Sequence, residues 1–485
     1  MQIIILGAGQ VGGTLAENLE GEDNDITVVD SSKERLAPLA SALDIRTIEG
    51  EAAHPDILAK AGAENADMLI AVTNSDETNM VACQIAWLLF KTPTKIARIR
   101  EPSYLVNHGR LFKKGVKGRI AVDVEISPEN VVTEHIFKLV QYPGSLQVVD
   151  FARGKVRLVA VRAYYGGPLV GSNIATLRQH IPNVDSRVAA IFRRGEPIVP
   201  TGDTVIEAND EVFFIAERND IIEVISELQR LEDPYKKIMI AGGGHIGTGL
   251  AHMLEGVNCQ VKVLERNQES AERLSAELKG TVLNTDASNK ELLLEENIED
   301  MDAFIAVTND DASNIMAAML AKKLGCRKVM ALINREEYVE LAEGHEIDIA
   351  ISPQQVTISS LLSFIRQGDV ATVYSLRHHT AEQRDPGSLE YVNRGSRENT
   401  AEAMETIAHG DSHTSKVVGK RIDELELPYG TTIGAIVRGE GDTEEVLMGH
   451  DDVIIESDDH VILFMVDKKS IKAVERLFEV DPTFI

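Results

Sequence analysis

The sequence of 485 residues has few cysteines and no long apolar run. Its three cysteines, Cys83, Cys259 and Cys326, lie far apart, which argues against a disulfide framework or a zinc site and favours core positions. No stretch approaches the roughly 18 consecutive apolar residues of a membrane-spanning helix. The apolar start at residues 3–6 is too short for a signal peptide, lacks a basic leader and runs into glycines. We therefore expect a cytoplasmic protein that is not inserted in a bilayer.

Positive charge is also scarce, with 49 Lys and Arg against 77 Asp and Glu and a net charge of −28. Nucleic acids and anionic lipids are bound mainly by Lys and Arg, so this balance argues against a nucleic-acid partner. The acidic surface has two explanations, simple solubility or adaptation to high salt, where screening relieves the self-repulsion.

An internal repeat runs through the whole chain. Residues 3–19, IIILGAGQVGGTLAENL, reappear at 238–254 as IMIAGGGHIGTGLAHML, and IAVTNSDETN at 70–79 reappears as IAVTNDDASN at 305–314. DVEISPENV at 123–131 likewise matches DIAISPQQV at 348–356. The conserved order of these matches indicates two fused copies of one module.

Each copy continues into a second, smaller part. Short β-branched runs separated by Gly, Pro and Asp predict a small α+β domain with mostly antiparallel strands. The predicted fold is therefore α/β, with two tandem Rossmann-like doubly wound parallel-sheet domains, each followed by a small α+β domain. We place the four domains at 1–139, 140–232, 233–370 and 371–485. The polar segment 381–400 has no counterpart in the first copy and is expected to be a long loop.

The first glycine motif lies in the context that dinucleotide binding requires. A buried strand at 3–6 leads to Gly7, Gly9 and Gly12, and Val11, Leu15 and Leu19 form the apolar face of the helix that follows. The glycines permit a tight turn, close approach of a phosphate and close helix packing, so the helix N-terminus can hold an anion. Asp30, at the end of the second strand, is placed to accept the ribose hydroxyls of an adenosine and would repel a 2′-phosphate. We expect NAD or an adenine nucleotide rather than NADP.

The second copy keeps this pattern with differences. Gly242, Gly244 and Gly247 repeat the turn and Glu265 repeats the carboxylate, whereas Gln10 becomes His245. Arg98 and Arg100, on the strand KIARIR, correspond to ALIN at 331–334, although Arg335 could partly replace the lost cation. Arg98 either clamps a phosphate or forms a strand-end salt bridge. The two sites should therefore differ in ligand or affinity.

Polar side chains also follow the fourth strand of each Rossmann unit, where open α/β sheets place their ligand crevice. Thr73, Asn74, Thr308 and Asn309 lie there as candidate ligand-binding groups. Helix capping is the alternative role for the same residues.

Neither a catalytic residue nor a metal site is evident. The histidines of the smaller domains are scattered among polar loops without ligand spacing such as HExxH, so we expect surface positions for them. No Walker A lysine motif, GxSxG elbow or kinase signature occurs. The sequence therefore favours a nucleotide-sensing regulator over the alternative, an NAD-dependent oxidoreductase.

With its duplicated Rossmann unit and small domain, the chain resembles the tandem RCK (regulator of potassium conductance) family, and more closely the cytosolic NAD-binding subunits of Trk-type potassium uptake systems. The segments MQIIILGAGQVGGTLAENL, TNSDETNMVACQ, TNDDASNIMAAMLAKKLG and ISPQQVTISSLL carry the resemblance, which covers nearly all of the chain. The longer 381–400 segment departs from the family pattern.

The resemblance implies a regulatory subunit that is not an enzyme and that gates a membrane-embedded potassium-translocating partner. It implies a homotetrameric ring, attached peripherally to the inner face of the membrane through that partner, and binding of NAD+ or NADH and of ATP or ADP. The implied cofactor-binding residues of the first site are Gly7, Ala8, Gly9, Gln10, Val11, Asp30, Thr73, Asn74 and Arg98. Those of the second site are Gly242, Gly243, Gly244, His245, Ile246, Glu265, Thr308 and Asn309.

Overall fold

The structure is a computed structural model, and it describes residues 1–20, 24–194, 196–229, 232–343, 347–365, 370–376, 401–439, 441, 444–466 and 470–479. Its internal contacts divide the chain into two units. Unit 1 contains Met1–Val132 and Pro353–Leu361, and unit 2 contains Thr133–Ser352 and Leu362–Ile485.

Unit 1 is built on a parallel sheet with the strand order β3-β2-β1-β4-β5-β6. The strands are β1 (Gln2–Leu6), β2 (Asp25–Asp30), β3 (Arg46–Glu49), β4 (Met68–Ala71), β5 (Thr94–Arg98) and β6 (Val124–Ile126). The helices are α1 (Gln10–Glu20), α2 (Lys33–Ala42), α3 (Pro55–Lys60), α4 (Asp76–Ile85) with its π-helical continuation (Ala86–Phe90), α5 (Pro102–Val106) and α6 (His108–Leu111). Because helices cover both faces of such a sheet, its inner strands are continuous apolar runs, as in the buried segment of β4.

Unit 2 contains a second parallel sheet with the equivalent order β14-β13-β12-β15-β16-β17. Its strands are β12 (Lys237–Ala241), β13 (Gln260–Glu265), β14 (Thr281–Asn284), β15 (Ala303–Ala306), β16 (Lys328–Leu332) and β17 (Ile349–Ile351). Its helices are α10 (His245–Gly256), α11 (Gln268–Glu277), α12 (Lys290–Glu295), α13 (Asp311–Lys323) and α14 (Glu336–Glu343). In both sheets the order reverses beside the first strand, which is where doubly wound folds bind ligands.

Two antiparallel sheets follow the parallel ones and share one strand order, β10-β9-β11-β8-β7 and β21-β20-β22-β19-β18. The first comprises β7 (Ser145–Phe151), β8 (Val156–Arg162), β9 (Ser186–Arg193), β10 (Glu196–Ile198) and β11 (Glu211–Glu217), with α8 (Leu177–His180) and α9 (Ile221–Ser226). The second comprises β18 (Val370–Leu376), β19 (Ala401–Ala408), β20 (Thr431–Arg438), β21 (Glu445–Met448) and β22 (Asp459–Met465), with α16 (Ile471–Phe478).

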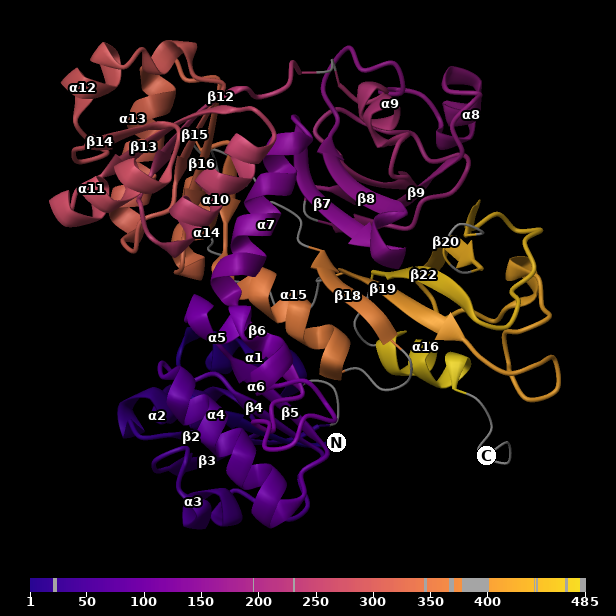
Figure 1. Ribbon diagram of the computed structural model, residues 1–485. Helices are drawn as coiled ribbons and strands as arrows, with labels where there is room; N and C mark the ends of the chain where they lie inside the picture. Colours follow the sequence, from indigo (N-terminus) through magenta and orange to yellow (C-terminus); the bar gives the residue numbers. More distant parts are fainter. Residues whose placement is uncertain are drawn as a thin grey trace. The chain divides into compact units, whose positions relative to one another are not determined.

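Strands of both antiparallel sheets are labelled in Figure 1. Their side chains contribute to one apolar core. Phe213 and Phe192 of the first sheet and Phe464 of the second belong to the same buried cluster. The absent side chain of Gly434 allows close contact there, since a Cβ at that position would lie 2.4 Å from the Phe464 ring. Burial of this apolar surface stabilises the association of the two small antiparallel domains.

Each parallel sheet is followed by a helix whose residues are divided between the two units. Helix α7 (Pro128–Gln141) follows β6, and its first residues belong to unit 1 while Thr133 and the residues after it belong to unit 2. Helix α15 (Pro353–Ile365) follows β17, and residues 353–361 belong to unit 1. Each helix therefore spans the division in the chain.

These sheets confirm the predicted fold class of two Rossmann-like parallel-sheet domains, each followed by a small α+β domain. The domain boundaries at 140, 232 and 371 stay predictions, and the 381–400 segment lies outside the described residues.

The expectation that the small-domain histidines lie in loops is wrong for His460, which is part of β22, and for His180, which ends α8. Side chains alternate between the two faces of a sheet, and His460 pairs with Ile407 of β19, two residues from Glu405, so His460 and Glu405 share one face. Over the described ranges, none of the helices has the length and hydrophobicity needed to cross a membrane.

His460 forms an ion pair inside the second small domain. Its Nδ1 lies 2.7 Å from Oε1 of Glu405, whose side chain is buried and also accepts a hydrogen bond from the backbone N–H of Ala152. The hydrogen bond to Glu405 raises the pKa of His460, although partial burial opposes this. A histidine whose pKa is raised by folding stabilises the fold below its unfolded pKa, and this contribution is lost as pH rises through the folded pKa.

We therefore expect the free energy of unfolding to fall as the pH is raised from about 6 to about 8. His460→Gln keeps a hydrogen-bond donor but does not titrate, so the difference between wild type and variant should be larger at the lower pH. Urea unfolding followed by circular dichroism at several pH values measures this difference. The same difference at every pH would contradict the ion pair.

Candidate functional site

The glycine turn after β1 is required by the fold. Gly7 has a φ of +107°, which favours glycine, and its N–H donates to the Val29 carbonyl at 2.7 Å. A Cβ on Gly12 would lie 1.9 Å from the Gly7 carbonyl oxygen, so helix α1 can approach the turn only without a side chain there. Gly242 and Gly247 repeat both constraints in the second copy.

The middle glycine of each motif has a different environment. A Cβ built on Gly9 or on Gly244 meets no atom within 4 Å. The protein itself therefore has room for a side chain at both positions. Lack of a side chain there leaves the backbone open to a ligand, as the pyrophosphate of a dinucleotide requires.

A carboxylate at the end of the second strand faces each glycine turn. Asp30, which is 8% exposed, accepts the Ala8 N–H with Oδ2 at 2.7 Å and the Ser32 N–H with Oδ1 at 2.8 Å. Glu265 accepts the Gly243 and Asn267 N–H groups at 2.8 and 2.7 Å in the same way. Each carboxylate oxygen has two lone pairs, so each carboxylate retains acceptor capacity for ribose hydroxyls.

The residue after the first glycine is matched to the length of this carboxylate. A Cβ on Gly243 would lie 2.9 Å from Oε2 of Glu265 and 2.3 Å from a methyl group of Leu274. In the first copy Ala8 occupies this position, and its N–H donates to Asp30, which is one methylene shorter than Glu265. The pairs Asp with Ala and Glu with Gly therefore build the same contact with different side chains.

The four remaining turn positions begin the two helices. Gln10 and Val11 are the first residues of α1, His245 and Ile246 are those of α10, and neither helix has an acidic residue in its first turn. The N–H groups of a first helical turn have no partner within the helix and attract an anion. Gln10 and His245 are exposed at the same position, so the two sites differ there.

Thr73 and Thr308, after β4 and β15, each bind a buried asparagine. Oδ1 of Asn79 accepts the N–H and the hydroxyl of Thr73, at 3.0 and 2.7 Å, and its Nδ2 donates to the carbonyls of Thr73 and Arg98. Asn314 makes the same four bonds to Thr308 and Leu332. These asparagines join the ends of two neighbouring strands and fix the rim of the crevice.

Asn74 and Asn309 are exposed and take no part in capping. The N-caps are the next residues, Ser75 for α4 and Asp310 for α13, which accept the N–H groups of Thr78 and Ser313. Hydrogen bonds from Ser313 lower the pKa of Asp310. The capping role that the sequence left open thus belongs to Ser75 and Asp310.

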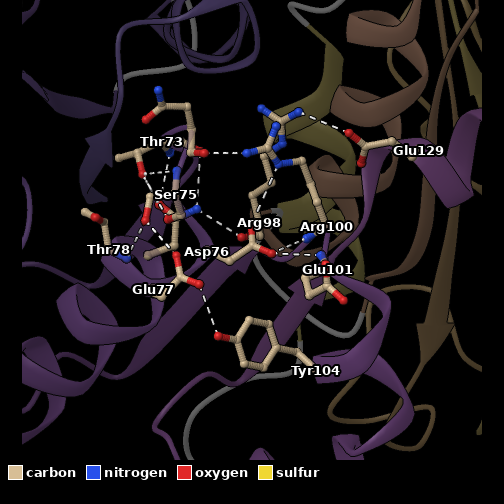
Figure 2. Close-up of polar contacts among 12 residues, drawn as sticks. Thr73, Ser75, Asp76, Glu77, Thr78, Arg98, Arg100, Glu101, Tyr104 and Glu129 are labelled. Atoms are coloured by element: carbon tan, nitrogen blue, oxygen red, sulfur yellow. Dashed lines mark hydrogen bonds and ion pairs between the residues drawn. The ribbon is translucent and has the colours of Figure 1, made fainter. Parts of the chain in front are cut away.

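A buried aspartate in the first turn of α4 holds the chain that leaves β5. Oδ2 of Asp76 accepts the N–H groups of Arg100 and Glu101, both at 2.8 Å, and Arg100 lies alongside it with Nε 3.8 Å from Oδ1 (Figure 2). Asp311 accepts the N–H groups of Asn334 and Arg335 in the second copy. Because the two aspartates bind equivalent N–H groups, Asn334 is the equivalent of Arg100 and Arg335 is the equivalent of Glu101.

Arg98 is the last residue of β5 and pairs with Glu129, with 3.5 Å between Nη2 and Oε1. Burial lowers the pKa of Arg98, and the charge of Glu129 opposes this shift. Asn79 donates to the carbonyl of Arg98, and Asn314 donates to the carbonyl of Leu332. Leu332 is therefore the residue of the second copy that is equivalent to Arg98. The second site therefore has neither the Arg98 nor the Arg100 guanidinium.

Sequence reasoning missed the four buried residues Asn79, Asn314, Asp76 and Asp311. The signal was present, because TNSDETN and TNDDASN repeat the aspartate and the final asparagine at the same offsets. We found no cluster of three or more His, Cys, Asp or Glu side chains that could hold a metal ion within the described residues.

These features define the chain as a tandem of two Rossmann-type domains, each followed by a small antiparallel domain. The family model of the TrkA-N domain matches residues 3–120 and 238–353, and that of the TrkA-C domain matches 158–229 and 412–479. Two relatives named Trk system potassium uptake protein TrkA, from Vibrio alginolyticus and Halomonas elongata, are each 57% identical and match over the full length of both chains. The chain therefore belongs to the TrkA family of Trk system potassium uptake proteins. As predicted, these relatives carry the name of a potassium uptake protein and not that of an enzyme.

Solved structures extend the likeness of the fold. The GsuK RCK domain covers 98% of this chain, with a TM-score of 0.58, 18% identity and 94% of its own length matched. The GsuK channel bound to NAD also covers 98% of this chain, with a TM-score of 0.59, 18% identity and 78% of its own length matched. At this identity the likeness shows the RCK-type fold alone.

Removing the buried asparagine of the first copy should destabilise unit 1. Asn79→Ala leaves the Thr73 and Arg98 carbonyls without a donor, and we expect a loss of about 2–4 kcal/mol in the free energy of unfolding. Fluorescence of Trp87, the one tryptophan of the sequence, reports urea unfolding of this unit. Exposed Asn74→Ala is the matched control, with an expected change within about 0.5 kcal/mol. Equal effects of the two variants would contradict the assigned role of Asn79.

Proposed function

We propose that this chain is a cytoplasmic regulatory subunit that senses an adenine nucleotide and controls a membrane-embedded potassium-translocating partner. The observation that carries the proposal is the repeated pair of a strand-end carboxylate and an open glycine backbone, at Asp30 with Gly9 and at Glu265 with Gly244. The carboxylates suit ribose hydroxyls and the open turns suit phosphates. Membership of a potassium uptake family supports potassium as the transported ion.

NAD+ or NADH is the proposed ligand, with ATP or ADP as further ligands of the same sites. All of them carry an adenosine whose ribose fits Asp30 or Glu265, and phosphates that fit the helix N-termini. The seventeen residues named from the sequence, from Gly7 to Arg98 and from Gly242 to Asn309, are the proposed binding residues. The GsuK channel bound to NAD supports this choice only through its similar fold.

Regulation requires unequal binding of the ligand to two conformations of the protein. A coupling free energy of about 1–3 kcal/mol changes an affinity about 5- to 150-fold, without any hydride transfer. The proposed assembly is a homotetrameric ring, attached to the inner face of the membrane through its partner. Each chain contributes four domains, for which we propose the ranges 1–139, 140–232, 233–370 and 371–485.

The exposed apolar surface of unit 1 supports a protein–protein contact in this assembly. Val81, Trp87, Leu88 and Leu89 are 40–61% exposed along α4 and its π-helical continuation. Large exposed apolar side chains gathered on one element are typical of interaction sites. The corresponding end of α13 carries Lys322 and Lys323 instead, so we assign the contact to the first copy.

Calorimetric titration of the full chain tests the two sites, with NAD+, NADH, ATP, ADP and, as the negative ligand, NADPH. Asp30→Asn and Glu265→Gln remove one negative charge each but keep side-chain size. We expect each variant to weaken binding at its own site about tenfold or more and to leave the other site unchanged, because a hydrogen bond to a charged group contributes about 1.5–3 kcal/mol. Each variant is therefore the control for the other.

The outcomes separate the possible explanations. Binding of NADH without its oxidation supports a sensor, whereas oxidation of bound NADH by the purified chain would support an oxidoreductase. Failure of every nucleotide to bind would overturn the proposal and leave the glycine turns as features of the fold. Equal binding of NADH and NADPH would contradict the role of the carboxylates, since a 2′-phosphate is repelled there.

A further inference from the structure

Helix α7 begins at the first site and continues into the other unit. Glu129, in its first turn, contacts Arg98, and both residues belong to unit 1. From Thr133 onward the same helix belongs to unit 2. Any change at the contact between Arg98 and Glu129 therefore acts on an element that the two units share.

The contact between Arg98 and Glu129 is weak and involves only one nitrogen of the guanidinium group. The 3.5 Å between Nη2 and Oε1 is at the outer limit of a hydrogen bond, and both side chains are about one-fifth exposed. Nε of Arg98 is buried and has no hydrogen-bond partner among the described residues. Since a guanidinium has five N–H donors, Arg98 can bind a further anion.

The position of Arg98 in the sheet indicates which part of a bound nucleotide would lie near it. β5 is two strands from β1, on the side away from β2 and Asp30. Neighbouring strands are about 4.8 Å apart, which places the end of β5 about 10 Å from the glycine turn. With the ribose on Asp30 and the first phosphate at the turn, the far phosphate or the second half of the ligand extends toward Arg98.

The second copy has neither member of this pair. Leu332 replaces Arg98, and Gln354, the second residue of α15, replaces Glu129, the second residue of α7. The two parallel sheets are otherwise alike in strand order and in their buried asparagines. The difference is therefore specific to the first site.

The later part of α7 is firmly attached within unit 2. Lys138 donates to Asp150 of β7 at 2.8 Å, and Asp150 also pairs with Arg157, which is 2% exposed and stacks on Tyr142 at 4.4 Å. Gly249 of α10, the helix after the second glycine turn, packs against Thr133, since a Cβ there would lie 3.4 Å from the Thr133 methyl group. A movement of α7 would thus reach both the first small domain and the second site.

We propose that Glu129 is a positioning residue that competes with the phosphate of the ligand for Arg98, so that a nucleotide in the first site releases the N-terminus of α7. A phosphate carries more charge than a carboxylate and can accept two guanidinium N–H groups at once. The released Glu129 remains favourable in the first turn of α7, where a negative charge complements the helix dipole. This inference rests on the proposed nucleotide binding and names its first mechanical step.

Glu129→Gln in the full chain tests the competition, with exposed Glu134→Gln on the same helix as the charge-matched control. A partly exposed ion pair contributes about 0.2–1 kcal/mol, so we expect ATP and NADH to bind the first site of Glu129→Gln up to about fivefold more tightly than wild type. Hydrogen exchange of the peptide covering 128–141 is the second readout. Nucleotide should speed exchange of the amides in its second turn in wild type, because these donate to the carbonyls of the first turn, and Glu129→Gln should exchange at that faster rate without nucleotide.

Arg98→Leu, which copies the second site, gives the complementary result. It should bind the first-site nucleotide more weakly while showing the same fast exchange of the second turn, so the two variants change affinity in opposite directions. Unchanged or weaker binding by Glu129→Gln, or nucleotide binding with no change in α7 exchange, would overturn the competition and leave the nucleotide site intact. No binding by wild type would overturn both this inference and the proposed function.

Discussion

The structure of both sites depends on one contact, between a strand-end carboxylate and the backbone N–H that follows the first glycine. Asp30 accepts the Ala8 N–H and Glu265 accepts the Gly243 N–H, at 2.7 and 2.8 Å. This contact orients the turn so that the next N–H groups point out of the helix N-terminus. In our proposal the same carboxylates also bind a ribose, so that one group both shapes the turn and recognises the ligand.

The two sites share a frame but differ in charge at their outer end. The frame consists of the glycine turn, the carboxylate and the buried asparagine that joins two strand ends. The first site contains Arg98 and Arg100. The equivalent residues of the second site are Leu332 and Asn334, which carry no charge. Since guanidinium groups bind phosphates strongly, ligands with phosphate beyond the turn should distinguish the two sites.

Much of the fold could be predicted from the sequence because it depends on local periodicity and on a repeat. The apolar run at 3–6, the glycines after it and the carboxylate after β2 are close in the chain and predict one Rossmann unit, and their repetition predicts the second. Boundaries and the 381–400 segment could not be settled in this way. His460 was wrongly placed in a loop because the polar residues before it, Ser457 to Asp459, obscure the start of β22.

The rest of the site depends on pairs that meet only after folding. Asn79 binds the carbonyl of Arg98, nineteen residues away, and Arg98 meets Glu129, thirty-one residues away, because neighbouring parallel strands bring their ends together. The structure of the chain with bound NADH or ATP tests the central claim most directly. We expect the adenosine ribose on Asp30 and the phosphates over Gly9, at the N-terminus of α1. A nucleotide bound elsewhere, with the glycine turns empty, would contradict it.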